Sequence, residues 1–306
     1  LQEQYDYVRG DNWPNQANPA ARGLFFGGEP SSNNLVNVIQ YIQIASEGNA
    51  TDFGDLTAAK RTGTATGNDT RSLYAGGSTS GGETDVIEYV TSATTGNATD
   101  FGDLSINNYG VVGCSSNTRA VISGGKDGFN NPKNLMEYVT VASTGNVTDF
   151  GDLAVTMRDG SSFGSNTRGI IIDGNDNDIN YITIASTGNA TDFGDSASSK
   201  FADSMTGCSN STIGITSSFS QTDADIYKLT IASTGNMTDF GGNTSSTRAS
   251  MAACASSIRG VFAGGAANNA SAGNIIDFVV FASAGNATDF GDLTATNNVM
   301  EGTSNA

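Results

Sequence analysis

The chain has 306 residues, of which 39 are glycine and four are proline, and it contains no histidine. Its formal net charge of −17 argues against a nucleic-acid partner, because binding to phosphates needs lysine and arginine. The lack of histidine excludes Ser-His-Asp and Cys-His catalysis and histidine-ligated metals, and no apolar run approaches the roughly 18 residues of a membrane-spanning helix.

The chain begins with a segment, residues 1–20, that lies outside the repetitive part of the sequence. Tyr5 and Trp13 belong to this segment. Aromatic side chains often serve as anchors at protein interfaces, so the segment could dock onto a neighbouring protein. It could equally be a linker that packs against the domain we expect over residues 21–306.

A nine-residue motif, GNATDFGDL, dominates the rest of the sequence. It recurs in identical or varied form at six positions, which start at Gly48, Gly96, Gly145, Gly188, Gly235 and Gly285. Successive copies are 43 to 50 residues apart. A period of this length indicates the blades of a propeller or the units of a solenoid.

Each repeat contains four candidate strands separated by turn residues. The last full repeat has small residues over 247–256, an apolar run ending in two glycines over 259–265, the run IIDFVVFAS over 275–283, and then the motif. Four short strands per repeat are typical of a propeller blade, whose innermost strand is crowded near the axis. Three cysteines fall at nearly the same place in this innermost strand, which predicts small buried residues and not disulfides; they are Cys114, Cys208 and Cys254.

The two ends of the repetitive part complement each other. Residues 21–28 form a second strand with no first strand before it, and residues 294–306 resemble a first strand with nothing after it. An open solenoid would instead need polar caps at its ends. We therefore predict an all-β fold, a six-bladed β-propeller of four-stranded antiparallel blades, with the ring closed by the C-terminal strand pairing with the N-terminal strand.

The repeats resemble the kelch and galactose-oxidase type of blade over about residues 21–306. The resemblance rests on a glycine pair after the second strand (Gly27-Gly28, Gly76-Gly77, Gly124-Gly125, Gly264-Gly265) and on an aromatic residue in the third (Tyr41, Tyr89, Tyr138, Tyr181, Phe278). The fourth and fifth repeats depart from it, reading Asp173-Gly174 and Ser217-Ser218 at the glycine pair, and the fourth-strand tryptophan of kelch repeats is missing. The copper chemistry of galactose oxidase cannot be carried over, because its histidine ligands have no counterpart.

The wording of the repeats, GNATDFGDLT together with RGVFAGG, is also similar to repeat proteins encoded by marine bacteriophages, notably cyanophages. Such proteins are generally taken to be associated with the virion. The resemblance therefore implies a location at the virion surface or outside the cell.

Two carboxylates flank Phe-Gly in five copies of the motif: Asp52 and Asp55, Asp100 and Asp103, Asp149 and Asp152, Asp192 and Asp195, and Asp289 and Asp292. In a structural interpretation, these side chains fix tight turns while the phenylalanine packs between blades. In a functional interpretation, each pair binds calcium together with backbone carbonyls, and no other cofactor is expected. The fifth copy keeps Asp239 but has Gly242 where we expect the second carboxylate.

An arginine opens the second strand in five repeats: Arg22, Arg71, Arg119, Arg168 and Arg259. We expect each arginine to form a bidentate latch with one carboxylate of the motif. Thr212 stands in its place in the fifth repeat, which also lacks the second aspartate, and this paired loss favours the latch.

The loop between the second and third strands differs most between repeats. In a propeller these loops emerge on one face, and variable loops on a constant scaffold can build a binding surface, although exposed loops also drift without function. The loop that starts at Lys126 combines two cations with an aromatic side chain. We therefore select Lys126, Phe129 and Lys133 as candidate contacts, beside Tyr5 and Trp13 from the leading segment.

These observations predict a non-enzymatic structural or adhesive module, a fibre, tail or capsid-decoration component of a phage virion. Its expected partners are other virion or surface proteins and possible host glycans, with no nucleic acid and no membrane insertion. A secreted or cell-surface bacterial adhesin is the first alternative. A carbohydrate-active propeller enzyme is the second, since paired carboxylates can hydrolyse glycosides, but an active site is normally one constellation and not six copies.

Overall fold

The computed structural model describes residues 21–174, 176–196, 205–217, 224–266 and 272–305. The leading segment, with Tyr5 and Trp13, lies outside these described residues. Among the described residues there is no helix of the length and apolarity that a membrane span requires.

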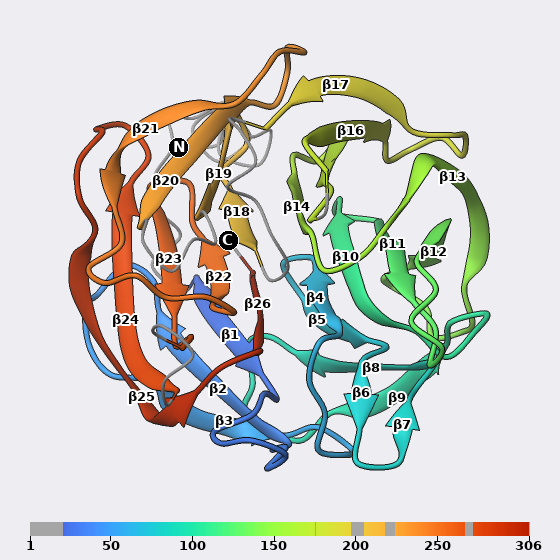
Figure 1. Cartoon of the computed structure of the whole chain (residues 1–306). Helices are drawn as coiled ribbons and strands as arrows, with labels where there is room; N and C mark the ends of the chain where they lie inside the picture. Colours follow the sequence, from blue (N-terminus) through green and yellow to red (C-terminus); the bar gives the residue numbers. More distant parts are fainter. Residues whose placement is uncertain (1–20, 175, 197–204, 218–223, 267–271, 306) are drawn as a thin grey trace, which may run out of the picture.

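The structure is a ring of six four-stranded antiparallel sheets, which confirms the predicted propeller (Figure 1). From the innermost to the outermost strand, blade 1 consists of β26 (Glu301–Ser304), β1 (Arg22–Phe26), β2 (Val38–Gln43) and β3 (Thr51–Asp55). Blade 2 consists of β4 (Thr64–Gly67), β5 (Arg71–Ala75), β8 (Val86–Thr91) and β9 (Thr99–Asp103), and a small hairpin of β6 (Ser78–Thr79) and β7 (Gly82–Glu83) extends from it.

The other four blades follow the same order. Blade 3 is β10 (Tyr109–Ser115), β11 (Arg119–Lys126), β12 (Lys133–Thr140) and β13 (Thr148–Met157), and blade 4 is β14 (Ser161–Gly164), β15 (Arg168–Ile172), β16 (Asp178–Thr183) and β17 (Thr191–Asp195). Blade 5 is β18 (Thr206–Ser209), β19 (Ile213–Ser217), β20 (Asp225–Thr230) and β21 (Thr238–Asn243), and blade 6 is β22 (Ala252–Ala255), β23 (Arg259–Ala263), β24 (Gly273–Val280) and β25 (Thr288–Asn297).

The ring closes inside blade 1, as predicted. The last strand of the chain, β26, pairs antiparallel with β1, and the register places Leu24 opposite Thr303 and Phe26 opposite Glu301. Figure 1 shows β26 among the innermost strands, beside β1. Residues about 280 positions apart in sequence therefore share one sheet, and the closing strand pairs with the edge of β1 that faces the axis.

The small residues of the innermost strands allow neighbouring blades to approach closely. The Sγ of Cys254 lies where a side chain on Gly23 of the next blade would be, only 2.3 Å from the position of its missing Cβ. Cys114 and Gly169 repeat this contact at the same distance. All three cysteines are free and buried, which confirms their predicted role as small core residues.

The glycine pair that ends the second strand also has a steric reason. Gly27 and Gly28 adopt φ values of 60° and 110°, in the region that glycine reaches without strain. A Cβ on Gly27 would lie 2.4 Å from the carbonyl oxygen of Lys60, which belongs to the connection leading into the next blade. The backbone N–H of Gly28 donates to that same carbonyl, so the pair joins one blade to the next.

Candidate functional site

The repeated motif forms a strap between adjacent blades on the outside of the ring. The N–H of Gly96 donates to the carbonyl of Phe53 in the preceding blade, and the side-chain oxygen of Asn97 accepts from the N–H of Asp55 at 3.1 Å. A Cβ on Gly54, whose φ is 150°, would lie 2.4 Å from the carbonyl oxygen of Gly96. The same asparagine-to-aspartate bond recurs at four more junctions, formed by Asn146, Asn189, Asn236 and Asn49.

The phenylalanine of the motif packs inside the blade and against its neighbour. Phe53 is the extra residue of a β-bulge, because Ile39 pairs with Gly54 while the next residue, Gln40, pairs with Asp52. The bulge turns the phenylalanine inward, where it meets Tyr41 edge to face with ring centroids 5.8 Å apart. Five blades form this aromatic pair, and the structural interpretation of the motif is therefore confirmed for its phenylalanine.

The carboxylates of the motif stand at the rim of the ring. The first aspartate of each copy is exposed, and its backbone lies in the outermost strand. No group of three or more acidic, cysteine or histidine side chains that could hold a metal occurs among the described residues. Calcium binding by the ten paired aspartates stays a prediction.

The arginine latch was wrong in its partner. In the described structure the five arginines form no ion pair with a carboxylate of the motif. Each guanidinium instead donates to a backbone carbonyl of the next blade, as Arg71 does to Val141 at 2.9 Å and Arg168 does to Ile231 at 3.0 Å. Each also lies 4.3 to 4.7 Å above the centroid of the third-strand aromatic ring of its own blade. A planar cation suits this position because it can stack on the ring while its N–H groups reach across the junction.

Blade 5 departs from this arrangement, and two sequence assignments made there were wrong. The residue at the arginine position is Ile213, which starts β19 and pairs with Thr230, and not Thr212. The second aspartate is replaced by Asn243, which pairs with Asp225, because the outermost strand of this blade contains one additional residue. Gly242 therefore contacts the backbone of Gly285 in the next blade. In the other blades this contact is made by the glycine between the phenylalanine and the second aspartate, as Gly54 does with Gly96.

The face that carries the variable loops, called here the loop face, also contains the start of every described innermost strand. Neighbouring strands of a blade run in opposite directions, so the loop after the second strand and the start of the first strand lie at the same end. Two backbone bridges confirm this arrangement, between Arg61 and Ser78 and between Ala249 and Ala266. The loops over residues 29–37, 76–85 and 126–132 lie on this face.

The two selected lysines are engaged within the chain, whereas Phe129 is free of the core. The Lys126 ammonium lies 2.7 Å from a carboxylate oxygen of Asp159, and the Lys133 ammonium lies 2.7 Å from Asp127. The hydrogen bond from Lys133, followed by backbone N–H donors in the loop, holds the pKa of Asp127 below its usual range. Phe129 is 89% exposed, on a loop that these internal contacts shape.

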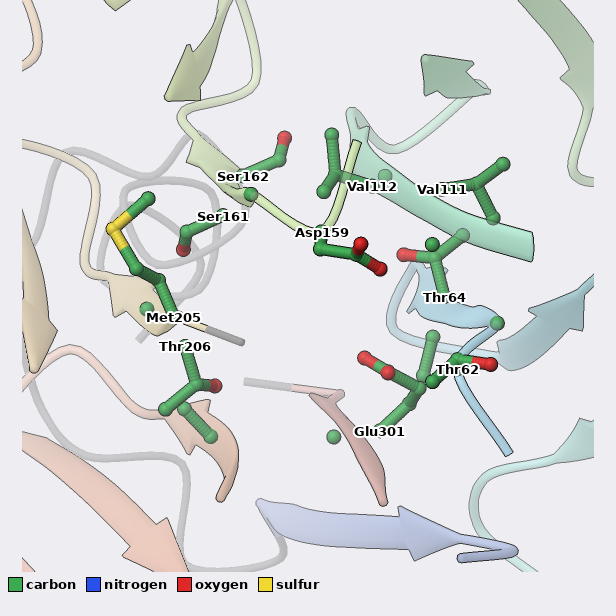
Figure 2. A pocket seen from close by; sticks show the side chains of 18 of the residues that line it. Thr62, Thr64, Val111, Val112, Asp159, Ser161, Ser162, Met205, Thr206 and Glu301 are labelled. Atoms are coloured by element: carbon green, nitrogen blue, oxygen red, sulfur yellow. The ribbon is translucent and has the colours of Figure 1, made fainter. Parts of the chain in front are cut away.

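A cavity of about 80 Å³ opens along the propeller axis at the loop face, where the innermost strands begin. All six blades contribute residues to it. Its walls combine glycine backbone and hydroxyl groups with valine and methionine side chains, among them Met205, Met251 and Met300. Figure 2 shows the carboxyl groups of Asp159 and Glu301 in this space, the first from the turn before β14 and the second from β26.

The two carboxyl groups of the cavity differ in their partners. Asp159 accepts from Lys126 and also lies 3.9 Å from Arg158. Glu301 has no cation as a partner among the described residues, although it lines the same cavity. Burial raises the pKa of Glu301 well above its usual value, and repulsion from Asp159 adds to this effect. The hydroxyl of Ser161, a side chain that is only 3% exposed, has no hydrogen-bond partner in the described structure.

Sequence reasoning missed Glu301 and Ser161 because they occupy a variable position of an otherwise uniform strand, and it missed Asp159 because that residue lies in the turn before β14. Glu301 pairs with the fifth residue of the second strand of its blade. The residues that occupy the equivalent position in the other innermost strands are Thr64, Val112, Ser161, Thr206 and Ala252. A glutamate among small residues at this position was the available signal. Its meaning depended on the ring closure that brings β26 to the axis.

The sequence matches no protein-family model, and none of the curated proteins with which it was compared matches it.

Proposed function

We propose that this protein is a non-enzymatic structural or adhesive module, a kelch-like propeller that serves as a fibre, tail or capsid-decoration component of a bacteriophage particle. On this proposal its loop face contacts another virion protein or a glycan on the host surface. The assignment to a phage draws its support from the similarity of the repeat wording to phage-encoded repeat proteins. The assignment to a binding role draws its support from the loop face itself.

The observation that carries the binding role is the contrast between Phe129 and its surroundings. Binding of a partner over an exposed phenylalanine removes apolar surface from water, which is favourable, and large aromatic side chains are frequent anchors of interfaces. Its loop is tied by the contacts of Asp127 with Lys133 and with the N–H of Phe129 at 3.0 Å. A preformed loop loses little conformational entropy when a partner binds, so Phe129 is poised for docking.

Mass spectrometry of purified phage particles that encode the sequence tests the location. The proposal expects peptides of this chain in the particles at a stoichiometry fixed by particle symmetry. Their absence from particles, together with their presence on the surface of bacterial cells, would favour the adhesin alternative and defeat the viral proposal.

A substitution pair tests the loop face. Phe129→Asp should abolish incorporation into particles or adsorption to host cells, because a charge cannot enter the apolar pocket or lie against a sugar face that receives the ring. Ile258→Asp is the matched control, since Ile258 is 38% exposed but lies in the turn between the first and second strands, at the opposite end of the blade. Equal behaviour of the two variants would refute the role of the loop face.

A further inference from the structure

The axial cavity contains one carboxyl group whose charge is balanced and one whose charge is not. The chain itself supplies an ammonium group to the first, since Lys126 contacts Asp159 at 2.7 Å. The Lys126 ammonium also lies 4.7 Å from the centroid of the Tyr109 ring, which fixes its position. Glu301 lines the same cavity without such a partner among the described residues.

We propose that this cavity binds a primary ammonium group on an alkyl chain, with the Glu301 carboxylate as its counter-ion. The chain itself holds an ammonium group against the other carboxylate of the cavity, since Lys126 contacts Asp159. A ligand that supplies an ammonium to Glu301 would form the equivalent charge-assisted hydrogen bond.

The walls of the cavity suit the apolar part of such a ligand. Met205, Met251 and Met300 belong to the residues of the lining, and methionine adapts its shape to irregular apolar groups. An alkyl chain can therefore lie along the methionines while its charged end reaches Glu301, in the way that lysine side chains combine an apolar stem with a charged head.

Two other ligand classes fit less well. A sugar ring is usually bound by stacking on an aromatic side chain, and the described lining contains none. Calcium takes six to eight oxygen ligands, commonly several of them carboxylates, whereas Lys126 already neutralises Asp159 and leaves one carboxylate in the cavity. An ammonium needs a single carboxylate and a few acceptors. The net charge of −17 also attracts cations to the molecule.

The raised pKa of Glu301 makes the binding dependent on pH. Two titratable groups interact electrostatically with Glu301, namely Asp159 from the turn before β14 and Tyr74 on β5. Lys126 forms an ion pair with Asp159. A neutral Glu301 must release its proton when the ammonium binds. The affinity should therefore fall by about tenfold for each pH unit below the pKa of Glu301.

The experiment observes the methionine methyl groups of the whole chain by NMR while n-butylammonium is added at pH 8. The inference predicts shifts for Met205, Met251 and Met300, and no shift for Met136, which lies in a core cluster that contains none of these three. Equal shifts with n-butanol would overturn it, because they would indicate an apolar cavity with no preference for charge. Loss of the shifts on adding millimolar calcium would also overturn it, in favour of an inorganic cation site.

Glu301→Gln keeps the shape of the side chain and should reduce the affinity for n-butylammonium at least tenfold. Glu47→Gln is the control, a carboxylate that is 52% exposed and belongs to the loop before the outermost strand, away from the cavity. An unchanged affinity in Glu301→Gln would overturn the inference. Well-dispersed methyl spectra of both variants show that each is folded.

The source of the ammonium is distinguished by a second probe. The methylamide of Nα-acetyl-lysine should shift the same methyl groups if a protein side chain can enter, and its Nε-acetylated form should not. Shifts with n-butylammonium alone would assign the site to free small amines. The inference rests on the proposed function only where a partner protein supplies the ammonium group. If the methyl groups shift but the protein is absent from phage particles, the ammonium site is retained and the phage role is rejected.

Discussion

Blade 5 and the other five blades solve the same problem of joining neighbours in different ways. In the five, an arginine on the second strand lies over an aromatic ring and donates to a carbonyl of the next blade. In blade 5, Ile213 occupies the position of the arginine and Lys228 occupies the position of the aromatic residue. Both partners of the cation–ring contact are thus replaced together, which teaches that the two residues act as one unit.

The residue that replaces the arginine in blade 5 is apolar. Ile213 packs against a cluster that contains Phe281 of blade 6. Phe281 occupies the position whose backbone carbonyl accepts the hydrogen bond from the arginine at the other junctions, as that of Ile231 does from Arg168. Lys228 in turn lies 5.8 Å from the centroid of the Phe240 ring, in place of the aromatic partner found elsewhere. Side-chain burial therefore substitutes at this junction for a charge-assisted hydrogen bond.

The largest effect is expected from the phenylalanine of the motif. Phe290 is 3% exposed and meets Phe278 at a centroid distance of 5.9 Å, within a cluster shared by blades 6 and 1. Phe290→Ala should lower the free energy of unfolding by about 3–5 kcal/mol. Phe240→Ala in blade 5, which lacks the aromatic partner, should cost about 0.5–1.5 kcal/mol less. Chemical denaturation measures both, and unchanged stability of Phe290→Ala would show that the phenylalanine does not hold the junction.

Addition of a single methyl group to the strap between blades should destabilise the protein. Gly54→Ala forces a φ of 150° on alanine and places its Cβ 2.4 Å from the Gly96 carbonyl oxygen, so we expect a loss of more than about 1 kcal/mol. Gly96→Ala is the control, because nothing lies within 4 Å of its added Cβ. If thermal melting shows the same change for both, the close approach of the blades is not what requires glycine.

The unit of arginine and aromatic ring can be tested by a double-mutant cycle in blade 4. Arg168 lies 4.4 Å from the Tyr181 ring centroid and donates to Ile231 at 3.0 Å, so Arg168→Ala should cost about 1–2 kcal/mol. Tyr181→Leu should reduce the further cost of Arg168→Ala by about 0.5–1 kcal/mol. Additive effects would show that the two side chains contribute separately. Ile213→Arg alone should give no gain, because blade 5 offers it no ring.

The smallest effect concerns the pH dependence of stability at the axis. The folded-state pKa of Glu301 is raised above its unfolded value, so its contribution to stability is present at low pH and is lost as the pH rises through the folded pKa. Glu301→Gln removes this loss. The variant should match the parent protein at pH 4 and be the more stable of the two at pH 8. Urea denaturation at both values checks the sign, and a variant less stable at pH 8 would contradict it.

The sequence was sufficient for the architecture because the repeats carry it redundantly. Six copies of one motif set the number of blades, and the two incomplete ends identified the closing strand. The partner of the arginines was not accessible, because a residue such as Arg71 reaches a carbonyl 70 positions away and backbone carbonyls leave no mark in a sequence. The additional residue in the outermost strand of blade 5 was hidden for a related reason. It is recognised only from the strand pairing, which sets Asn243 and not Gly242 opposite Asp225.

The axial cavity illustrates the same limit. Asp159 and Glu301 are 142 positions apart, and only the closure of the ring brings both to one space (Figure 2). Phe129, selected as a candidate contact, is 89% exposed, whereas both lysines beside it are bound to aspartates. Local composition indicated which loop is unusual but not which of its charges are already paired.

The closed ring is measured most directly by backbone NOEs in the deuterated protein. The structure predicts contacts between the amides of residues 23–26 and those of residues 301–304, in the antiparallel register that sets Leu24 against Thr303. Their presence would place the last strand within the first blade. If NOEs between β1 and β2 are observed while none connects β1 to the last strand, the chain is an open array, and neither the axial cavity nor the shared loop face exists.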